Sequence, residues 1–231
     1  MNYKVSIFVI IAALPLLPFA SLAQSPGAQR FWVKHAGALR DVMRNRDFSA
    51  RIDLAALKGT PHLYALGPSE GLNAEITVFD GRPAIAVVEN GTVRVKQTFP
   101  KAAFLVYSRV DRWQQVNVPA TVKTAEDVEV FVAKAAGAKG IDSKKPFPFL
   151  LRGRPERISY HVVKNGDHIP FEGKGKPIEV LGIYSASHHG VFTHHGTNIH
   201  LHFRTGDDKE SGHIDTLDLS LGTTLYLPSS R

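Results

Sequence analysis

The chain of 231 residues contains no cysteine. This absence excludes thiolate-ligated zinc sites, iron–sulfur clusters, disulfide-stapled scaffolds, cysteine nucleophiles and lipid attachment at an N-terminal cysteine. Nucleic-acid-binding modules are also missing. The 28 lysines and arginines outnumber the 21 acidic residues, but they are scattered and form no stripe interleaved with aromatic residues. We therefore expect no nucleic-acid partner.

The first 23 residues have the layout of a secretory signal peptide. A basic start precedes the apolar run Val5–Ala20, and Ser21-Leu22-Ala23 places small residues where a signal peptidase requires them. Cleavage is expected before Gln24, and the mature protein should be periplasmic or secreted. Pro15 and Pro18 disfavour the alternative, an uncleaved membrane anchor. No later apolar run is long enough to span a bilayer, so we expect no membrane association after cleavage.

The remaining sequence predicts an α+β protein with few helices. Its sheets should be predominantly antiparallel or mixed and form two closely packed lobes. A segment rich in lysine and proline, residues 139–148, is the best internal boundary. We therefore expect an N-terminal β-rich lobe with flanking helices over residues 24–145 and a C-terminal β lobe over residues 146–231.

Helices are predicted over Phe31–Arg46, Arg51–Lys58 and Thr124–Ala136, the last with Thr124 as its N-cap. Strands are predicted at Glu75–Phe79, Ala84–Glu89, Thr92–Gln97, Ala103–Ser108, Phe149–Arg152, Arg157–Val163, Glu179–Tyr184, Asn198–Arg204 and His213–Leu219. The first three are separated by Asp80-Gly81 and Asn90-Gly91, the strongest short-range signal of a β-hairpin. They should form a three-stranded meander.

Six of the 11 histidines fall between His188 and His202. Polar and apolar residues alternate along the predicted strand at Asn198–Arg204, so His200 and His202 should point to the same face. The polar loop that follows should return the chain as an antiparallel strand at His213, beside the first two histidines. Three imidazoles suit a divalent ion such as zinc, iron, manganese, nickel or copper, and leave positions open for water or substrate. The alternative is a polar strand face whose histidines bond to neighbours or solvent.

Other residues near this hairpin are candidates for supporting roles. Asp215 could be a ligand or accept a hydrogen bond from an imidazole, and Arg204 could bind substrate or orient a ligand. His194 or His195 could act in acid–base chemistry or bind a substrate carboxylate, or could belong to a mobile rim loop. His188 and His189 are interpreted as rim residues.

Two separated motifs resemble those of the bacterial α-acetolactate decarboxylases. The first, His200-x-His202-Phe203 followed by Gly212-His213, resembles the metal-binding region of that family. The second runs from Gly67 through Leu72-Asn73-Ala74-Glu75 to Asp80-Gly81. It resembles the family's Gly-Thr-Phe-x-x-Leu-Asp-Gly-Glu-x-x-x-x-Asp-Gly, whose glutamate is catalytic and falls on Glu75.

The resemblance implies two β-rich lobes with a metal in the cleft between them, and a homodimer. It also implies a carboxy-lyase that converts 2-acetolactate to acetoin and CO2, with one divalent transition metal, most simply zinc. A metal that chelates the oxygens of a small carboxylate substrate stabilises developing enolate charge, and Glu75 would handle protons.

Two departures from the family pattern bear on activity. His161 stands where the family has an active-site arginine; it could still donate a hydrogen bond to a carboxylate, or Arg152, Arg154 or Arg157 could replace the arginine. The family's C-terminal segment supplies a glutamate to the site, but no acidic residue follows Asp218 here.

Three alternatives therefore stay open. The protein could be another carbon–carbon lyase or isomerase on the same scaffold, or a non-catalytic periplasmic metal-binding protein. A cupin-type site is a weaker alternative, since Glu210 lies too far beyond His202 to be the usual cupin glutamate.

Overall fold

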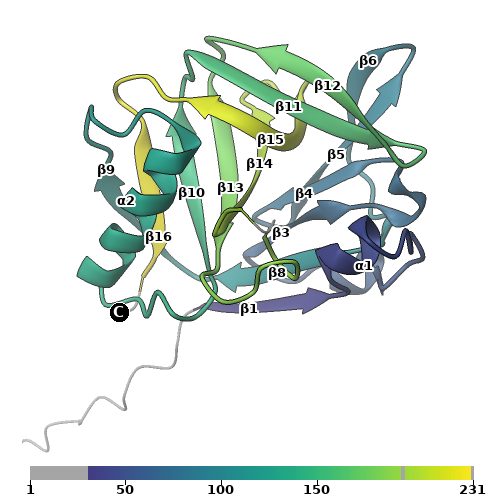
Figure 1. The fold of residues 1–231 in the computed structure, drawn as a ribbon, viewed down its shortest axis with the longest axis horizontal. Helices are drawn as coiled ribbons and strands as arrows, with labels where there is room; N and C mark the ends of the chain where they lie inside the picture. Colours follow the sequence, from purple (N-terminus) through teal and green to yellow (C-terminus); the bar gives the residue numbers. More distant parts are fainter. Residues whose placement is uncertain (1–30, 194–195, 230–231) are drawn as a thin grey trace, which may run out of the picture.

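The computed structural model describes residues 31–193 and 196–229. The expected signal peptide and the candidates His194 and His195 lie outside the described residues. In the described part of the chain, the fold consists of two large antiparallel sheets that pack against each other, a small two-stranded sheet, and a helix on the outside (Figure 1). This arrangement confirms the predicted α+β class, with its dominant antiparallel sheets and few helices.

The smaller sheet has the strand order β1-β8-β3-β4-β5-β6, and every neighbouring pair is antiparallel. Its strands are β1 (Phe31–Ala36), β3 (Leu63–Pro68), β4 (Glu75–Phe79), β5 (Arg82–Glu89), β6 (Thr92–Lys96) and β8 (Leu105–Val110). The predicted meander is confirmed as β4, β5 and β6. Asp80 and Asn90 have φ of 50° in the connecting turns, each followed by a glycine of positive φ, as tight hairpin turns require.

The larger sheet has the strand order β12-β11-β15-β14-β13-β10-β16-β9, again antiparallel throughout. Its strands are β9 (Trp113–Asn117), β10 (Phe147–Gly153), β11 (Arg157–Lys164), β12 (Asp167–Gly173), β13 (Ile178–Tyr184), β14 (Ile199–Thr205), β15 (Ser211–Asp218) and β16 (Thr224–Pro228). Strand β9 precedes residue 145 but pairs with β16. The two sheets therefore do not divide at the boundary expected from the sequence.

The main apolar core joins the two large sheets, and a second, smaller cluster includes Leu63, Ile76 and Leu105 of the smaller sheet. One continuous cluster of buried apolar residues joins Leu66 and Phe79 of the smaller sheet to Phe149, Leu181 and Phe203 of the larger one. Strands β4 and β5 lie against β11, β14 and β15 across this interface. Residues that face inward from β4 and β14 are thus brought together although they are far apart in the sequence.

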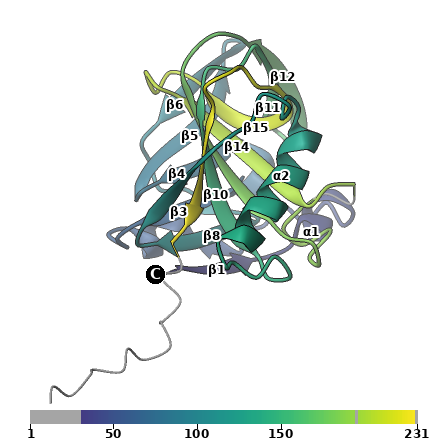
Figure 2. The ribbon, with the colours of Figure 1, turned by 90° about the vertical axis from the view of Figure 1, so that its left-hand side faces the viewer.

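Helix α2 (Ala125–Ala138) packs on the outer face of the larger sheet, against β13 and β15 (Figure 2). Val128 and Val132 are buried on its inner side. Thr124 and Asp127 form a capping box at its start, which confirms Thr124 as the predicted N-cap.

The predicted helix over Phe31–Arg46 is wrong for its first half. Residues Phe31–Ala36 form β1, which pairs with β8, and only Leu39–Met43 form the helix α1. Gly37, with φ of 74°, separates the two elements. The apolar spacing fits a helix, but pairing with a distant strand outweighs that local preference.

The predicted helix over Arg51–Lys58 is shorter than expected. It consists of a 3-10 turn, η1 (Leu54–Leu57), that follows β2 (Ile52–Asp53), and β2 pairs with β7 (Lys101–Ala102). A second 3-10 turn, η2 (Glu70–Leu72), precedes β4. None of the described helices is long and apolar enough to cross a membrane.

Candidate metal centre

Three histidines converge on the inner side of the larger sheet. His200 and His202 lie on β14, and His213 lies directly opposite His202 on the neighbouring strand β15. The His200 Nε2 atom is 3.1 Å from His213 Nδ1, and one nitrogen from each of the three rings lies within 4.8 Å of the others. The predicted hairpin geometry is thus present.

The rings of His200 and His202 are oriented by partners on their Nδ1 side. His200 Nδ1 donates to the carbonyl oxygen of Phe192 at 2.8 Å, and His202 Nδ1 is 3.0 Å from the Thr77 hydroxyl. Because these contacts occupy Nδ1 of both rings, Nε2 of each ring remains available to a metal ion at the centre of the cluster. This arrangement is usual for histidine ligands. Ligand nitrogens around a tetrahedral ion with ordinary zinc–nitrogen bonds lie about 3.3 Å apart. The 3.1 Å spacing between His200 and His213 therefore fits a divalent transition metal.

Glu75 reaches this cluster from the opposite sheet. It is the first residue of β4, only 2% exposed, and its Oε2 lies 3.6 Å from His202 Nε2. Its Oε1 lies 3.9 Å from His161 Nε2. Burial raises the pKa of Glu75 to about 7, although the charge of His161 and a hydrogen bond from the Val163 amide oppose this rise. The carboxyl group can therefore both accept and donate a proton near neutral pH.

His161 lies beside the cluster on β11, opposite His213 of β15. Its Nδ1 is 2.7 Å from Asp215 Oδ1, and its ring stacks on His168 at 4.1 Å and on His213 at 4.6 Å. Burial alone would lower the pKa of His161. The hydrogen bond to Asp215 and the charges of Glu75 and Asp215 outweigh that effect and raise the pKa. Asp215 thus orients His161 rather than any of the three clustered histidines.

A second set of possible ligand atoms overlaps the first. His161, His213 and Asp215 also present nitrogen and oxygen atoms within 4.8 Å of one another. His213 belongs to both sets. A cavity of about 480 Å³ opens beside this second set, lined by His161, His168, Thr197, His213 and Asp215. Solvent or a small ligand can therefore reach His213, the member shared by both sets, from this side.

The close packing of β11 on β15 depends on Gly212, the residue before His213. A Cβ atom at this position would lie 2.8 Å from both the His161 carbonyl oxygen and the Tyr160 ring. Any larger residue would push the two strands apart at the point where His161 and His213 stack. The glycine of the Gly-His motif therefore has a packing role.

Other candidates from the sequence lie away from the cluster. Arg204 is two residues beyond His202 on β14, but its guanidinium pairs with Glu179 at 2.7 Å. His188 lies near the Ser185 hydroxyl, and His189 donates to the Asn198 side chain, so both are held within their own loop. Arg152, Arg154 and Arg157 are absent from the described lining of the cavity beside His161. No arginine in that lining replaces the one expected at position 161.

Two supporting residues were not found from the sequence. Thr77 lies two residues after Glu75 on β4, so strand alternation could have placed it on the same inward face. Glu129 of α2 could not have been found in this way. Its carboxylate accepts hydrogen bonds from the Thr197 hydroxyl at 2.6 Å, the Asn198 amide at 3.0 Å and the Asn198 side chain. It thereby fixes the start of β14, directly before His200.

We expect Glu129→Ala to destabilise the protein by about 1–3 kcal/mol, because these partly buried donors lose a charged acceptor. Urea unfolding followed by circular dichroism measures the change. Lys134→Ala, an exposed substitution on the same helix, is the matched control and should change stability by less than about 0.5 kcal/mol. Equal stability of the two variants would contradict the anchoring role of Glu129.

Comparisons with known proteins place this geometry in a known architecture. The sequence matches no protein-family model and no curated protein. The structure, however, is similar to crystal structures of α-acetolactate decarboxylase from Bacillus subtilis strain 168 and from Bacillus subtilis subspecies spizizenii. Both have a TM-score of 0.68 and 14% identity, and the alignments cover 86% of this chain and 85% and 86% of theirs.

A third similar structure comes from Staphylococcus aureus and is described as a protein of unknown function similar to α-acetolactate decarboxylase. Its TM-score is 0.65 at 12% identity, over 84% of both chains. Identities this low show a shared architecture, which is the one that the two sequence motifs predicted. The chain therefore has the acetolactate decarboxylase fold.

Proposed function

We propose that this protein is a divergent, metal-dependent carboxy-lyase of the acetolactate decarboxylase type. It would convert 2-acetolactate to acetoin and CO2, or act on a similar small oxygenated acid. The observation that carries the proposal is the buried Glu75 carboxyl, which reaches across the sheet interface to a cluster of three histidines. Export, zinc as the metal and a homodimeric assembly belong to the same proposal.

The residues of the cluster divide into two roles. His200, His202 and His213 would hold the divalent ion, which supplies Lewis acidity toward the substrate oxygens. Glu75 would move a proton at the reacting carbon or hydroxyl, since its pKa of about 7 keeps both protonation states accessible. The sheet interface buries Glu75 almost completely and so keeps water from this carboxyl group.

His161 would bind the substrate carboxylate, in the position where the family has its arginine. Its Nδ1 is held by Asp215, so its Nε2 points toward Glu75 and the cluster. The raised pKa of His161 increases the share of its charged form, which is the form that pairs with a carboxylate.

Metal analysis of the purified mature protein, run beside an acetoin assay, tests the proposed function. We expect about one divalent ion per chain and release of acetoin from 2-acetolactate by the metal-loaded protein. Metal bound without acetoin release would favour the second candidate function.

That second candidate is a non-catalytic metal-binding protein on the same scaffold. It is favoured by one observation. The overlapping set of His161, His213 and Asp215 offers further ligand atoms at the place where a decarboxylase should bind substrate.

The substitution His161→Phe distinguishes two possible roles of His161, which are binding of the substrate carboxylate and ligation of metal. If His161 binds substrate, the phenyl ring keeps the stacking but loses the charged hydrogen bond. The kcat/KM value should then fall about tenfold to a hundredfold while the metal content stays constant. Steady-state kinetics and metal analysis of the same preparation measure both quantities.

Asp215→Asn is the companion variant. It removes the charge beside His161 but retains a side-chain oxygen, so we expect a smaller loss of kcat/KM than in His161→Phe. A loss of bound metal in either variant would show that the pair ligates metal, which would contradict the substrate-binding role.

A further inference from the structure

A second cavity lies apart from the histidine cluster. It has a volume of about 740 Å³ and lies where the end of β10 and strands β13 and β14 of the larger sheet meet the start of β5 in the smaller one. This volume is within the range of small-molecule sites. The lining shares no residue with the cavity beside His161. The proposed function therefore leaves it without a role.

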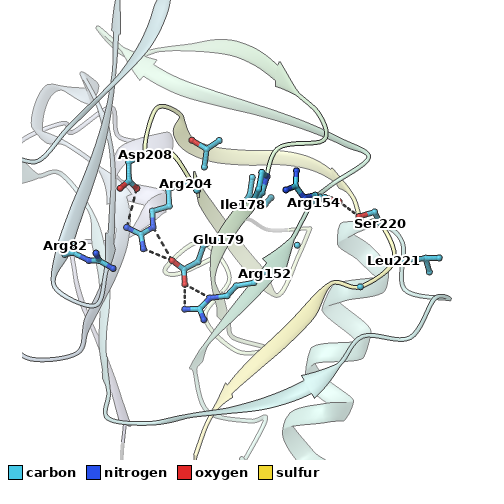
Figure 3. A pocket seen from close by; sticks show the side chains of 14 residues that line it. Arg82, Arg152, Arg154, Ile178, Glu179, Arg204, Asp208, Ser220 and Leu221 are labelled. Carbon is cyan, nitrogen blue, oxygen red and sulfur yellow. Dashed lines mark hydrogen bonds and ion pairs between the residues drawn. The ribbon is translucent and has the colours of Figure 1, made fainter.

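Four arginines line this cavity: Arg82, Arg152, Arg154 and Arg204. The only acidic residues in the described lining are Glu179 and Asp208, so it carries a formal surplus of two positive charges. Figure 3 shows Glu179 in the middle with Arg152 and Arg204, and shows Arg82 and Arg154 on opposite sides of them. The cavity therefore concentrates positive charge in a concave surface.

Two of these arginines are held in place by Glu179. Arg152 donates from Nε and Nη2 to Glu179 Oε1 at 2.8 and 2.6 Å, and Arg204 donates to Oε2 at 3.2 and 2.7 Å. Each guanidinium also lies over an aromatic ring: Arg152 is 4.8 Å from the Tyr226 centroid, and Arg204 is 4.6 Å from that of Phe79. These contacts fix the floor of the cavity before any ligand binds.

The other two arginines have no carboxylate partner among the residues that the structure describes. Within the described parts of the chain, neither Arg82 nor Arg154 takes part in an ion pair, and both are exposed at the cavity. Arg154 donates to the Gly175 carbonyl oxygen at 3.2 Å, which restrains its side chain. Guanidinium groups favour paired hydrogen bonds to carboxylate and phosphate oxygens.

We propose that this cavity is a second binding site, for a small molecule that carries two negative charges on carboxylate or phosphate oxygens. Arg82 and Arg154 would bind the anion directly, and the pairs formed by Glu179 with Arg152 and Arg204 would shape the floor. The site is separate from the proposed catalytic centre, so it does not depend on decarboxylase activity.

Calorimetric titration of the metal-loaded mature protein at low ionic strength tests the proposal. The probes are succinate and inorganic phosphate, with acetate as a singly charged comparison. Succinate or phosphate should bind at least about tenfold more tightly than acetate, and the tighter of the two identifies the preferred head group. No saturable binding of either dianion up to about 10 mM would overturn the proposal.

Substitutions of the arginines that line the cavity test whether the dianion binds there. Arg82→Gln and Arg154→Gln should each weaken dianion binding about tenfold to a hundredfold. The matched control is Arg94→Gln, which removes an exposed arginine of β6 outside the cavity and should leave the affinity within about twofold. Equal weakening in all three variants would show attraction to net charge alone and would contradict a built site.

Glu179→Gln should change the affinity for dianions in the opposite direction to the arginine variants. It removes a negative charge from the floor, so that Arg152 loses its carboxylate partner and Arg204 keeps only Asp208. Dianions should therefore bind more tightly than to the unmodified protein. Weaker binding in a folded Glu179→Gln protein would contradict the charge argument. His213→Ala should leave dianion binding unchanged, which distinguishes failure of this site from failure of the metal centre.

Discussion

Substitution of Glu75→Gln should reduce the release of acetoin by about 10²- to 10⁴-fold, the usual contribution of a general acid–base group. Glutamine has the shape of a protonated glutamate, so it fits the nearly closed space between the sheets. It cannot take up or release a proton, however. Metal content should remain at the level of the unmodified protein, because Phe192 and Thr77, rather than Glu75, orient the rings of His200 and His202.

Glu70→Gln is the matched control for this substitution. Glu70 lies in the same motif segment, five positions before Glu75, but its side chain is exposed. This variant should keep full turnover. The role assigned to Glu75 would be refuted by a Glu75→Gln protein that retains turnover, and a loss of metal together with turnover would reassign Glu75 as a ligand.

Replacing any one of His200, His202 and His213 by alanine should lower metal affinity by more than about a hundredfold. Loss of an orienting partner alone typically weakens metal binding by tens to a hundredfold, and loss of a ligand should exceed that. Each alanine also leaves only two imidazoles of the cluster, too few for a closed set of three protein ligands. Competition with a chromophoric chelator measures the affinity, and elemental analysis measures the content.

His62→Ala is the control for this series. His62 is exposed in the turn before β3 and pairs with Asp80 at 3.0 Å, so its loss should leave metal content unchanged. Undiminished metal in all three cluster variants would eliminate the site.

The parts of the fold that are determined by residues close together in the sequence could be predicted. The meander β4-β5-β6 follows from alternating apolar residues and two Asx-Gly turns, which are local signals. Helix α2 follows from a cap at Thr124 and an apolar stripe. The placement of Phe31–Ala36 could not be predicted in the same way, because its partner β8 lies far along the chain and local periodicity contains no information on that pairing.

The candidate site also combines residues that local sequence patterns could place with residues placed by the packing of distant segments. A period of two on β14 and the return of the chain at β15 were enough to bring His200, His202 and His213 together. That Glu75 faces them follows from the packing of one sheet on the other. Only the resemblance to a known motif indicated it in advance.

Arg204 shows where strand alternation falls short. It follows His202 by two positions, as His202 follows His200, so strand alternation places it on the same face as the two histidines. Its pairing with Glu179 and its contact with Phe79 place it in a different cavity. Sharing a strand face does not define which cavity a long side chain enters.

The hydrogen bond from His200 to Phe192 has a consequence for how this loop can vary in evolution. The acceptor is a main-chain carbonyl, which every residue type possesses. Point substitutions at position 192 therefore do not remove the acceptor. Insertions or deletions between β13 and β14 would displace the carbonyl itself. Among relatives that retain this centre, selection should preserve the length of the loop before His200 more strictly than the identity of its side chains.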